Sequence, residues 1–212
     1  MDINLYKYFF KRILDIILAI IVLPLFVLIF IVIGSIIYCE DKGSIFYNAP
    51  RLGKKGKTFN MYKFRSMKMN APDIRNKDGS TFNSGNDLRL TKIGRFIRKT
   101  SIDEIPQVIN VIKGDMSFIG PRPDLPEHIN YYEGNEKRKL EVLPGITGYN
   151  QAYFRNLVTW KDRIKNDCYY VDNISLWLDV KIFFKTIESI VLKKGVYIKP
   201  KGKDEEGENL HV

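Results

Sequence analysis

The stretch IILAIIVLPLFVLIFIVI, residues Ile16–Ile33, decides the fold of this chain. Every residue in it is apolar, and no charged residue occurs from Ile16 to Tyr38. A run of about 20 apolar residues is what a helix needs to enter and cross a bilayer. The apolar region of a secretory signal peptide is shorter, and no A-x-A-like cleavage site follows here. The sequence therefore predicts a membrane segment near the amino terminus.

Basic residues flank the apolar stretch on both sides. Three of them lie in residues 7–12, and residues 39–70 carry eight Lys and Arg against two acids. Because basic flanks favour the cytoplasmic side, a segment that enters and leaves by the same face satisfies both flanks. Pro24 removes a helical hydrogen bond and kinks the helix. We therefore expect residues 1–38 to form a re-entrant membrane helix broken at Pro24, with a plain spanning helix as the alternative.

The remaining sequence alternates short extended pieces with helical patterns. Residues 59–67 alternate aromatic and polar side chains as a strand does, and Gly114 is placed to end a helix. Arg12 and Asp15, spaced i, i+3, are expected to pair where the chain enters the membrane. The pattern predicts helices over residues 91–100, 105–112, 126–141, 158–171 and 174–194, and a loop over residues 70–88.

The fold class that follows is α+β. We expect the re-entrant helix to be followed by a compact, mostly helical cytosolic domain with a small β element, over residues 39–198. Residues 199–212 are polar and charged and are expected to form a disordered tail.

Composition restricts the class of partner. The chain has 212 residues and a net charge of +10, which attracts nucleic acid, anionic lipid or nucleotide phosphates. The apolar and charged fractions, 45% and 27%, exclude a wholly disordered or collagen-like chain. Cys39 and Cys168 lie far apart without metal-ligand spacing, so we expect neither a zinc site nor a disulfide framework.

The acid pair Asp103–Glu104 is the candidate for chemistry. Ser101 lies three residues before Glu104, so a capping box at a helix start is one explanation. Cations also gather in the sequence around the pair, and Arg122 is held between two prolines. Carboxylates bind Mg²⁺ together with substrate phosphates, arginines bind phosphate oxygens, and a carboxylate can act as a nucleophile. The pattern therefore favours a site for a diphosphate and a divalent metal.

Five motifs together resemble the small bacterial sugar transferases, the monotopic phosphoglycosyl transferases, over roughly residues 6–198. They are FKRILDIILA…P (residues 10–24), YKFRSM (residues 62–67), TKIGRFIRKTSIDEIPQVINVIKGDMSFIGPRP (residues 91–123), LPGITGYNQ (residues 143–151) and DCYYVDNISLWLDVKIFFKTI (residues 167–187). The block from Ser101 to Pro123 is long and highly specific.

The resemblance implies a reaction and a place for it. Such enzymes move a sugar-1-phosphate from a UDP-sugar to undecaprenyl phosphate and release UMP, through an aspartyl phosphosugar intermediate. This step initiates O-antigen, capsule, exopolysaccharide or glycoprotein glycan synthesis. It requires Mg²⁺ and takes place at the cytoplasmic face of the bacterial inner membrane. The partners implied are the UDP-sugar, undecaprenyl phosphate and membrane lipid, with no nucleic acid, and a homodimer is left open.

The resemblance also implies roles for residues. Asp103 matches the nucleophile of the family and Glu104 the residue that holds Mg²⁺. Four further residues match positions that the family links to its active site, as phosphate or donor contacts: Lys63, Arg98, Arg122 and Asp167. Leu23 stands where family members often have Ser before the proline, and GYNQAYFRN (residues 148–156) departs from the commoner form of that motif.

A second class of function stays open on the residues alone. Basic loops with aromatic side chains also suit a membrane-anchored protein that binds nucleic acid or anionic lipid without catalysis. That function would leave Asp103 and Glu104 without a role. The sequence does not decide the donor sugar or the glycan pathway.

Overall fold

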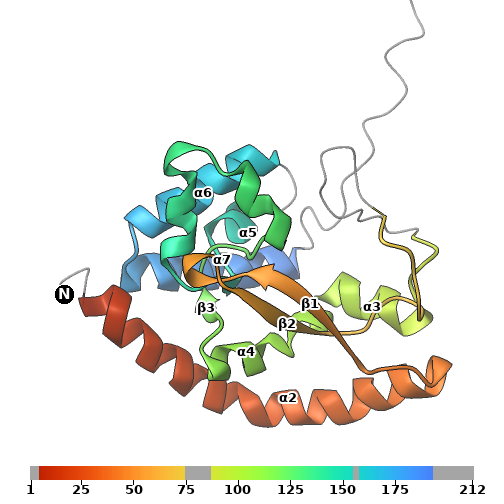
Figure 1. The fold of residues 1–212 in the computed structure, drawn as a ribbon. Coiled ribbons are helices and arrows are strands. Elements are labelled where there is room, and N and C mark those ends of the chain that lie inside the picture. Colours follow the sequence, from red (N-terminus) through yellow and green to blue (C-terminus); the bar gives the residue numbers. More distant parts are fainter. Residues whose placement is uncertain (1–4, 75–86, 155–157, 193–212) are drawn as a thin grey trace, which may run out of the picture.

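The computed structural model describes residues 5–74, 87–154 and 158–192, and it confirms a mixed, mostly helical class with small sheets (Figure 1). The helices are α2 (Lys11–Asp41), α3 (Lys92–Thr100), α4 (Gln107–Lys113), α5 (Tyr149–Tyr153), α6 (Trp160–Asp172) and α7 (Leu176–Val191), preceded by a π-helical turn, Tyr6–Phe10. The strands are β1 (Phe46–Leu52), β2 (Thr58–Phe64), β3 (Ser117–Ile119) and β4 (Gly145–Thr147). Short 3₁₀ helices cover Lys54–Gly56, Ile102–Glu104, Pro126–Tyr131 and Gly134–Glu141.

Most of the predicted helices are confirmed. Four of the patterns correspond to α3, α4, α6 and α7, and Gly114 ends α4 with a left-handed φ of 89°. The charged stretch 126–141 forms two 3₁₀ helices instead of one regular helix. The predicted loop 70–88 lies partly, and the predicted tail 199–212 wholly, outside the described residues.

The apolar stretch forms one long helix. α2 continues as α-helix through Pro24, so the expected break at this proline is not seen. Figure 1 shows α2 curved along its length, which is how a helix accommodates a proline without ending. Only 17% of its most apolar window is buried against the rest of the protein, so α2 is not a core helix of a soluble fold. Its length and composition suit a membrane.

The first turns of α2 are docked onto α4 and β3. Arg12 donates to the carbonyl oxygens of Val111 and Ile112 at 2.8 and 3.2 Å. Asp15 accepts from Ser117 Oγ at 3.0 Å and from the Phe118 amide at 2.9 Å. The expected pairing of Arg12 with Asp15 was therefore wrong, because each side chain has a partner from a distant segment.

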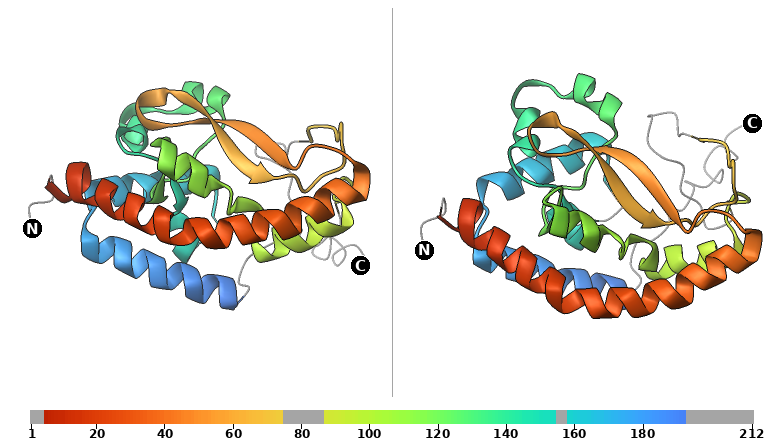
Figure 2. Two further views of the ribbon diagram at one scale, coloured as in Figure 1. Left: turned by 90° about the horizontal axis from the view of Figure 1, so that it is seen from below. Right: turned by 60° about the horizontal axis from the view of Figure 1, so that its bottom comes forward.

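The last turn of α2 makes a second set of contacts with the rest of the protein, away from those of Arg12 and Asp15. Glu40 accepts hydrogen bonds from the Lys92 and Ile93 amides, and so caps the amino terminus of α3. Asp41 forms a bidentate ion pair with Arg65 at 2.5 Å. Figure 2 shows α2 running along the body between these two attachments.

The antiparallel hairpin β1–β2 is fixed by one buried side chain of α4. Asn110 is fully buried, accepts from the Tyr62 amide at 2.9 Å and donates to the Asn60 carbonyl at 2.8 Å. Phe46 and Phe64, paired across the two strands, stack in the core beneath. Because Asn110 fixes both the position and the register of β2, it also fixes where Lys63 of this strand lies.

The second small sheet, formed by β3 and β4, fixes the position of the loop after β3. β3 and β4 pair in parallel, and the backbones approach so closely that side chains do not fit. A Cβ atom on Gly120 would lie 2.5 Å from the Leu143 carbonyl oxygen, and one on Gly145 would lie 2.1 Å from the Gly120 nitrogen. The glycines therefore hold the segment that leads into Arg122 in one position.

Asp179 of α7 joins the start of the chain to the helical body. Its carboxylate accepts from Tyr6 Oη at 2.7 Å, Tyr170 Oη at 2.7 Å and Lys11 Nζ at 2.5 Å, and all four side chains are buried. Asp179→Asn would leave the buried Lys11 charge without its counter-ion, which costs about 3–5 kcal/mol. Thermal unfolding in detergent micelles is the measurement.

Asp172→Asn is the matched control for this prediction. Asp172 pairs with Arg138, and both side chains are 42% exposed. Such a surface pair contributes about 1 kcal/mol or less. An equal loss of stability in the two variants would contradict the structural role assigned to Asp179.

Candidate active site

The acid pair lies in a sharp turn between α3 and α4. Ser101 ends α3 in the left-handed region, with φ of 60°, and the 3₁₀ helix Ile102–Glu104 follows. Ser101 makes no side-chain cap, so the capping box expected for Ser101 and Glu104 was wrong. The carboxylates of Asp103 and Glu104 are thus not used to cap a helix.

Two cations from two other segments converge on one oxygen of Glu104. Lys63 Nζ of β2 donates to Glu104 Oε1 at 2.6 Å, and Arg122 Nη2 donates to the same atom at 3.0 Å. Burial by itself raises the pKa of the Glu104 carboxyl, but Lys63 and Arg122 outweigh it and hold this pKa well below its usual range. Glu104 is therefore ionised throughout the physiological range.

Asp103 has a different environment. Its side chain is 8% exposed and accepts no hydrogen bond from the described residues. Burial is the largest cause that raises the pKa of Asp103 to about 6, and the charge of Glu104 adds to it. Lys63, Arg98 and Arg122 act in the opposite sense. Between the two neighbouring carboxyls, a proton therefore binds first to Asp103.

Arg98 brings a third cation to the acid pair. Ile97 packs into the core, which places the neighbouring Arg98 half-buried on α3. Its Nη1 atom is buried and has no hydrogen-bond partner among the described residues. A buried donor without a partner is costly, and such atoms in clefts often point to a ligand. Lys63 and Arg122 thus contact the acid pair, and the charge of Arg98 acts on Asp103.

Asp167 belongs to a second buried cluster. Lys139 forms ion pairs with Asp167 at 2.8 Å and with Asp124 at 2.6 Å, and Asp124 also accepts from Tyr132 Oη at 2.7 Å. Burial raises the pKa of Asp167 to about 6, whereas Lys139 holds the pKa of Asp124 below its usual range against its own burial. The structure therefore does not place Asp167 in contact with Asp103 or Glu104.

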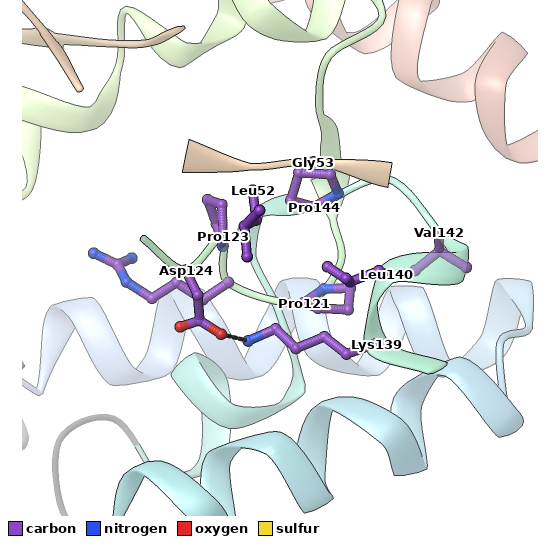
Figure 3. Close-up of a pocket in the computed structure, with 10 residues that line it drawn as sticks. Leu52, Gly53, Pro121, Pro123, Asp124, Lys139, Leu140, Val142 and Pro144 are labelled. Atoms are coloured by element: carbon purple, nitrogen blue, oxygen red, sulfur yellow. Dashed lines mark hydrogen bonds and ion pairs between the residues drawn. The ribbon is translucent and has the colours of Figure 1, made fainter. Parts of the chain in front are cut away.

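The cluster of Asp124, Lys139 and Asp167 is connected to the candidate active site through the backbone between Arg122 and Asp124. Asp124 follows Pro123 directly, so its bond to Lys139 holds the end of the loop that carries Arg122 (Figure 3). The backbone of Asp124 also accepts from the Leu52 amide at 2.8 Å. Leu52, Asp124 and Lys139 line a small pocket to which Arg122 also contributes. Asp167 and Lys139 thus support the position of Arg122.

Sequence reasoning missed Lys139 and Asp124 of the second cluster, and it did not single out Gln151 elsewhere in the fold. Lys139 lies in a charged stretch where nothing marks it as buried, and Gln151 lies in a motif that departs from the family. Both amide atoms of Gln151 are buried without a hydrogen-bond partner among the described residues. Asp124 could have been found from the sequence, because it directly follows the GPRP segment.

The model of a known family matches almost the whole chain. Residues 6–193 match the family described as "Bacterial sugar transferase". The chain belongs to the bacterial sugar transferase family. The match confirms the family to which the motifs point.

Named relatives agree with the family. The chain is 39% identical over 186 residues to the "Uncharacterized sugar transferase EpsL" of Bacillus subtilis, covering 88% of this chain and 89% of that protein. It is 38% identical over 204 residues to the "Undecaprenyl-phosphate galactose phosphotransferase" of Salmonella typhimurium, covering 89% of this chain and 42% of that protein. It is 43% identical over 169 residues to an "Uncharacterized sugar transferase" of Haemophilus influenzae, covering 74% and 36%. The chain thus spans less than half the length of the last two.

The acid pair of this sugar transferase fits the magnesium ion that the resemblance implies. No group of three or more His, Cys, Asp and Glu side chains placed to hold a metal occurs within residues 5–74, 87–154 and 158–192. Mg²⁺ does not need such a group, because one or two carboxylates commonly bind it together with substrate phosphates. Asp103 and Glu104 offer that donor set, and both hydrogen bonds to Glu104 fall on Oε1 alone.

The raised pKa of Asp103 predicts the acid limb of the activity profile. If Asp103 reacts as a carboxylate, activity falls as the pH drops through about 6, because the carboxyl becomes protonated. Lys63→Met removes the cation that most lowers this pKa, so the midpoint of the acid limb moves to higher pH. The measurement is the rate of sugar transfer from pH 4.5 to 8, and the midpoint is read independently of the absolute rate.

Lys57→Met is the matched control for the pH profile. Lys57 lies in the same hairpin, and its side chain is exposed. Its substitution is expected to leave the midpoint unchanged. If the midpoint of the acid limb does not move in Lys63→Met, the group that titrates in this limb is not Asp103.

Proposed function

We propose that this sugar transferase moves a sugar-1-phosphate from a UDP-sugar to undecaprenyl phosphate and releases UMP. The single observation that carries the proposal is the buried carboxylate of Asp103, which accepts no hydrogen bond from the described residues, beside the ion-paired Glu104 and under the influence of three cations. Membership of the family and the printed name of the Salmonella relative support it. The reaction would initiate the assembly of a lipid-linked glycan.

The transfer takes place in two displacements. Oδ of Asp103 attacks the phosphorus that carries the sugar, and the bond from that phosphorus to the UMP oxygen breaks. UMP leaves with the bonding electrons, and an aspartyl phosphosugar remains. The phosphate oxygen of undecaprenyl phosphate then attacks the same phosphorus, which forms the lipid diphosphate sugar and restores the Asp103 carboxylate.

The surrounding residues bind and orient the donor. Arg98 offers a buried guanidinium atom that has no hydrogen-bond partner in the described part of the chain, which suits a phosphate oxygen. Lys63 and Arg122 hold Glu104 in place and add positive charge where the phosphoryl charge develops. Glu104 would hold Mg²⁺, which supplies further neutralisation of the diphosphate when bound. A nucleic-acid binder would have no need of this buried acid pair.

We further propose that α2 is re-entrant and that the enzyme acts at the cytoplasmic face of the inner membrane. Both ends of α2 contact the same folded body, through Arg12 and Asp15 at the start and Glu40 and Asp41 at the end. A helix that crossed the bilayer would carry these ends to opposite sides, where one body does not reach both. The exposed apolar side chains of α7, among them Trp177 and Phe184, suit the same interface.

The first test of the reaction is Asp103→Asn. The amide is not a competent nucleophile, so UMP release from UDP-sugars with undecaprenyl phosphate and Mg²⁺ is expected to fall on the order of 10³-fold or more. Wild-type enzyme incubated with a radiolabelled UDP-sugar is also expected to keep label after denaturation, and Asp103→Asn is not. Asp162→Asn, an acid on α6 whose side chain is 46% exposed, is the control. Unchanged UMP release in Asp103→Asn would contradict the assignment of Asp103 as the nucleophile.

The topology is tested with cysteines at both ends of the membrane segment. Cys39 is native and exposed near the end of α2, and Leu5→Cys adds a site near its start. A re-entrant helix predicts that a membrane-impermeant maleimide reaches neither site in intact spheroplasts and both after permeabilisation. Labelling of Leu5→Cys alone in intact spheroplasts would indicate a spanning helix.

A further inference from the structure

A cavity of about 230 Å³ lies at the start of α2, apart from the acid pair. It forms where the π-helical turn Tyr6–Phe10, the first turns of α2, the turn of the β1–β2 hairpin, the start of β3, the segment before β4 and the loop before α7 meet. Its lining residues are Lys7, Tyr8, Lys11, Arg12, Asp15, Lys54, Ser117, Val142, Leu143 and Ile174. None of the residues that surround Asp103 is among them.

Two of the cations in this cavity are already paired with the protein. Lys11 is bound to Asp179 at 2.5 Å, and Arg12 donates to two carbonyl oxygens of α4. Asp15, the acid of the cavity, receives its hydrogen bonds from Ser117 and Phe118. These side chains form the fixed wall of the cavity.

The other two cations have no acidic partner. Lys7 Nζ and Lys54 Nζ lie over the Tyr8 ring, 5.6 and 5.7 Å from its centroid. Neither lysine forms an ion pair with a carboxylate in the described part of the chain, and both are half-buried. Both lysines line the cavity without a carboxylate partner among the described residues, so an anion that enters the cavity would be stabilised by their charge.

Apolar side chains beside the cavity indicate the kind of anion. Leu5, Phe9, Phe10, Ile13 and Leu14 are all exposed at the same end of the membrane segment. The cavity is smaller than the roughly 300–1,000 Å³ of sites that enclose a whole ligand, so it admits a headgroup while the chains stay outside. A phosphate with acyl chains attached fits both the charges and the apolar surroundings.

We propose that this cavity binds the phosphate of an anionic glycerophospholipid such as phosphatidylglycerol. The lipid is a bound structural partner and is not the acceptor, because the cavity does not include the residues at Asp103. Its phosphate binds in the cavity with Lys7 and Lys54, and its acyl chains lie along the exposed side chains at the start of α2. The inference does not rest on the proposed reaction.

The test measures lipid binding by the full-length protein. Delipidated protein in phosphatidylcholine micelles is titrated with dioleoyl phosphatidylglycerol, and the apparent affinity is read from the rise in unfolding temperature. The double variant Lys7→Gln, Lys54→Gln is expected to bind about 30-fold more weakly, since each lysine near a lipid phosphate contributes roughly 5-fold. Lys55→Gln is the matched control, because Lys55 is exposed in the same turn and does not line the cavity.

Further arms separate this lipid from other anions. Lys7→Arg with Lys54→Arg is expected to restore binding, which excludes a folding defect as the cause. Unchanged phosphatidylglycerol affinity in the Gln variant would overturn the proposal. Displacement of the lipid by an equal concentration of inorganic phosphate would indicate a free-phosphate site and overturn it. A loss confined to undecaprenyl phosphate would make the cavity an acceptor site and overturn it as well.

Discussion

One carboxylate oxygen, Oε1 of Glu104, joins three segments that are far apart in the sequence. Lys63 comes from a strand, Glu104 from the turn between two helices, and Arg122 from a loop held between two prolines. Removing Glu104 would leave both Lys63 and Arg122 without the acceptor that they share, whereas removing one cation leaves Glu104 paired with the other. The arrangement of the candidate active site therefore depends on this shared hydrogen-bond acceptor, and the rest of the fold serves to bring its donors within reach.

The short helix α4 sets the distance between the acid pair and the membrane segment. It begins just after Asp103 and Glu104, and its carboxyl end receives the Arg12 side chain. A seven-residue helix is about 10 Å long, and α4 lies between the turn with the acid pair and the carbonyl oxygens that bind Arg12. In the middle of α4, Asn110 fixes β2 and thereby Lys63. One helix thus connects the start of α2 with the acid pair and with Lys63.

The sequence predicts what is encoded locally and fails where partners are distant. Periodicity gave the helices, and the apolar run gave α2, because both signals lie within one segment. The capping box failed because Ser101 adopts a left-handed φ that its spacing to Glu104 does not reveal. The Arg12–Asp15 pairing failed because both side chains meet residues about 100 positions away. Lys63 and Arg122 were predicted from the family motifs. No local feature of the sequence indicates that Lys139 is buried.

The two acids share one turn but have opposite environments, and this difference separates their roles. The hydrogen-bonding cations lie on Glu104, which keeps it ionised and weakly basic. Asp103 is buried and accepts no hydrogen bond within the described ranges, and this burial raises its pKa to about 6. A carboxyl with this pKa is about nine-tenths ionised at pH 7, yet more basic than an exposed aspartate. Pairs of carboxyls with divergent pKa values commonly divide two tasks between them. In the proposed reaction, the more basic acid attacks phosphorus and the ion-paired acid holds the charge around it.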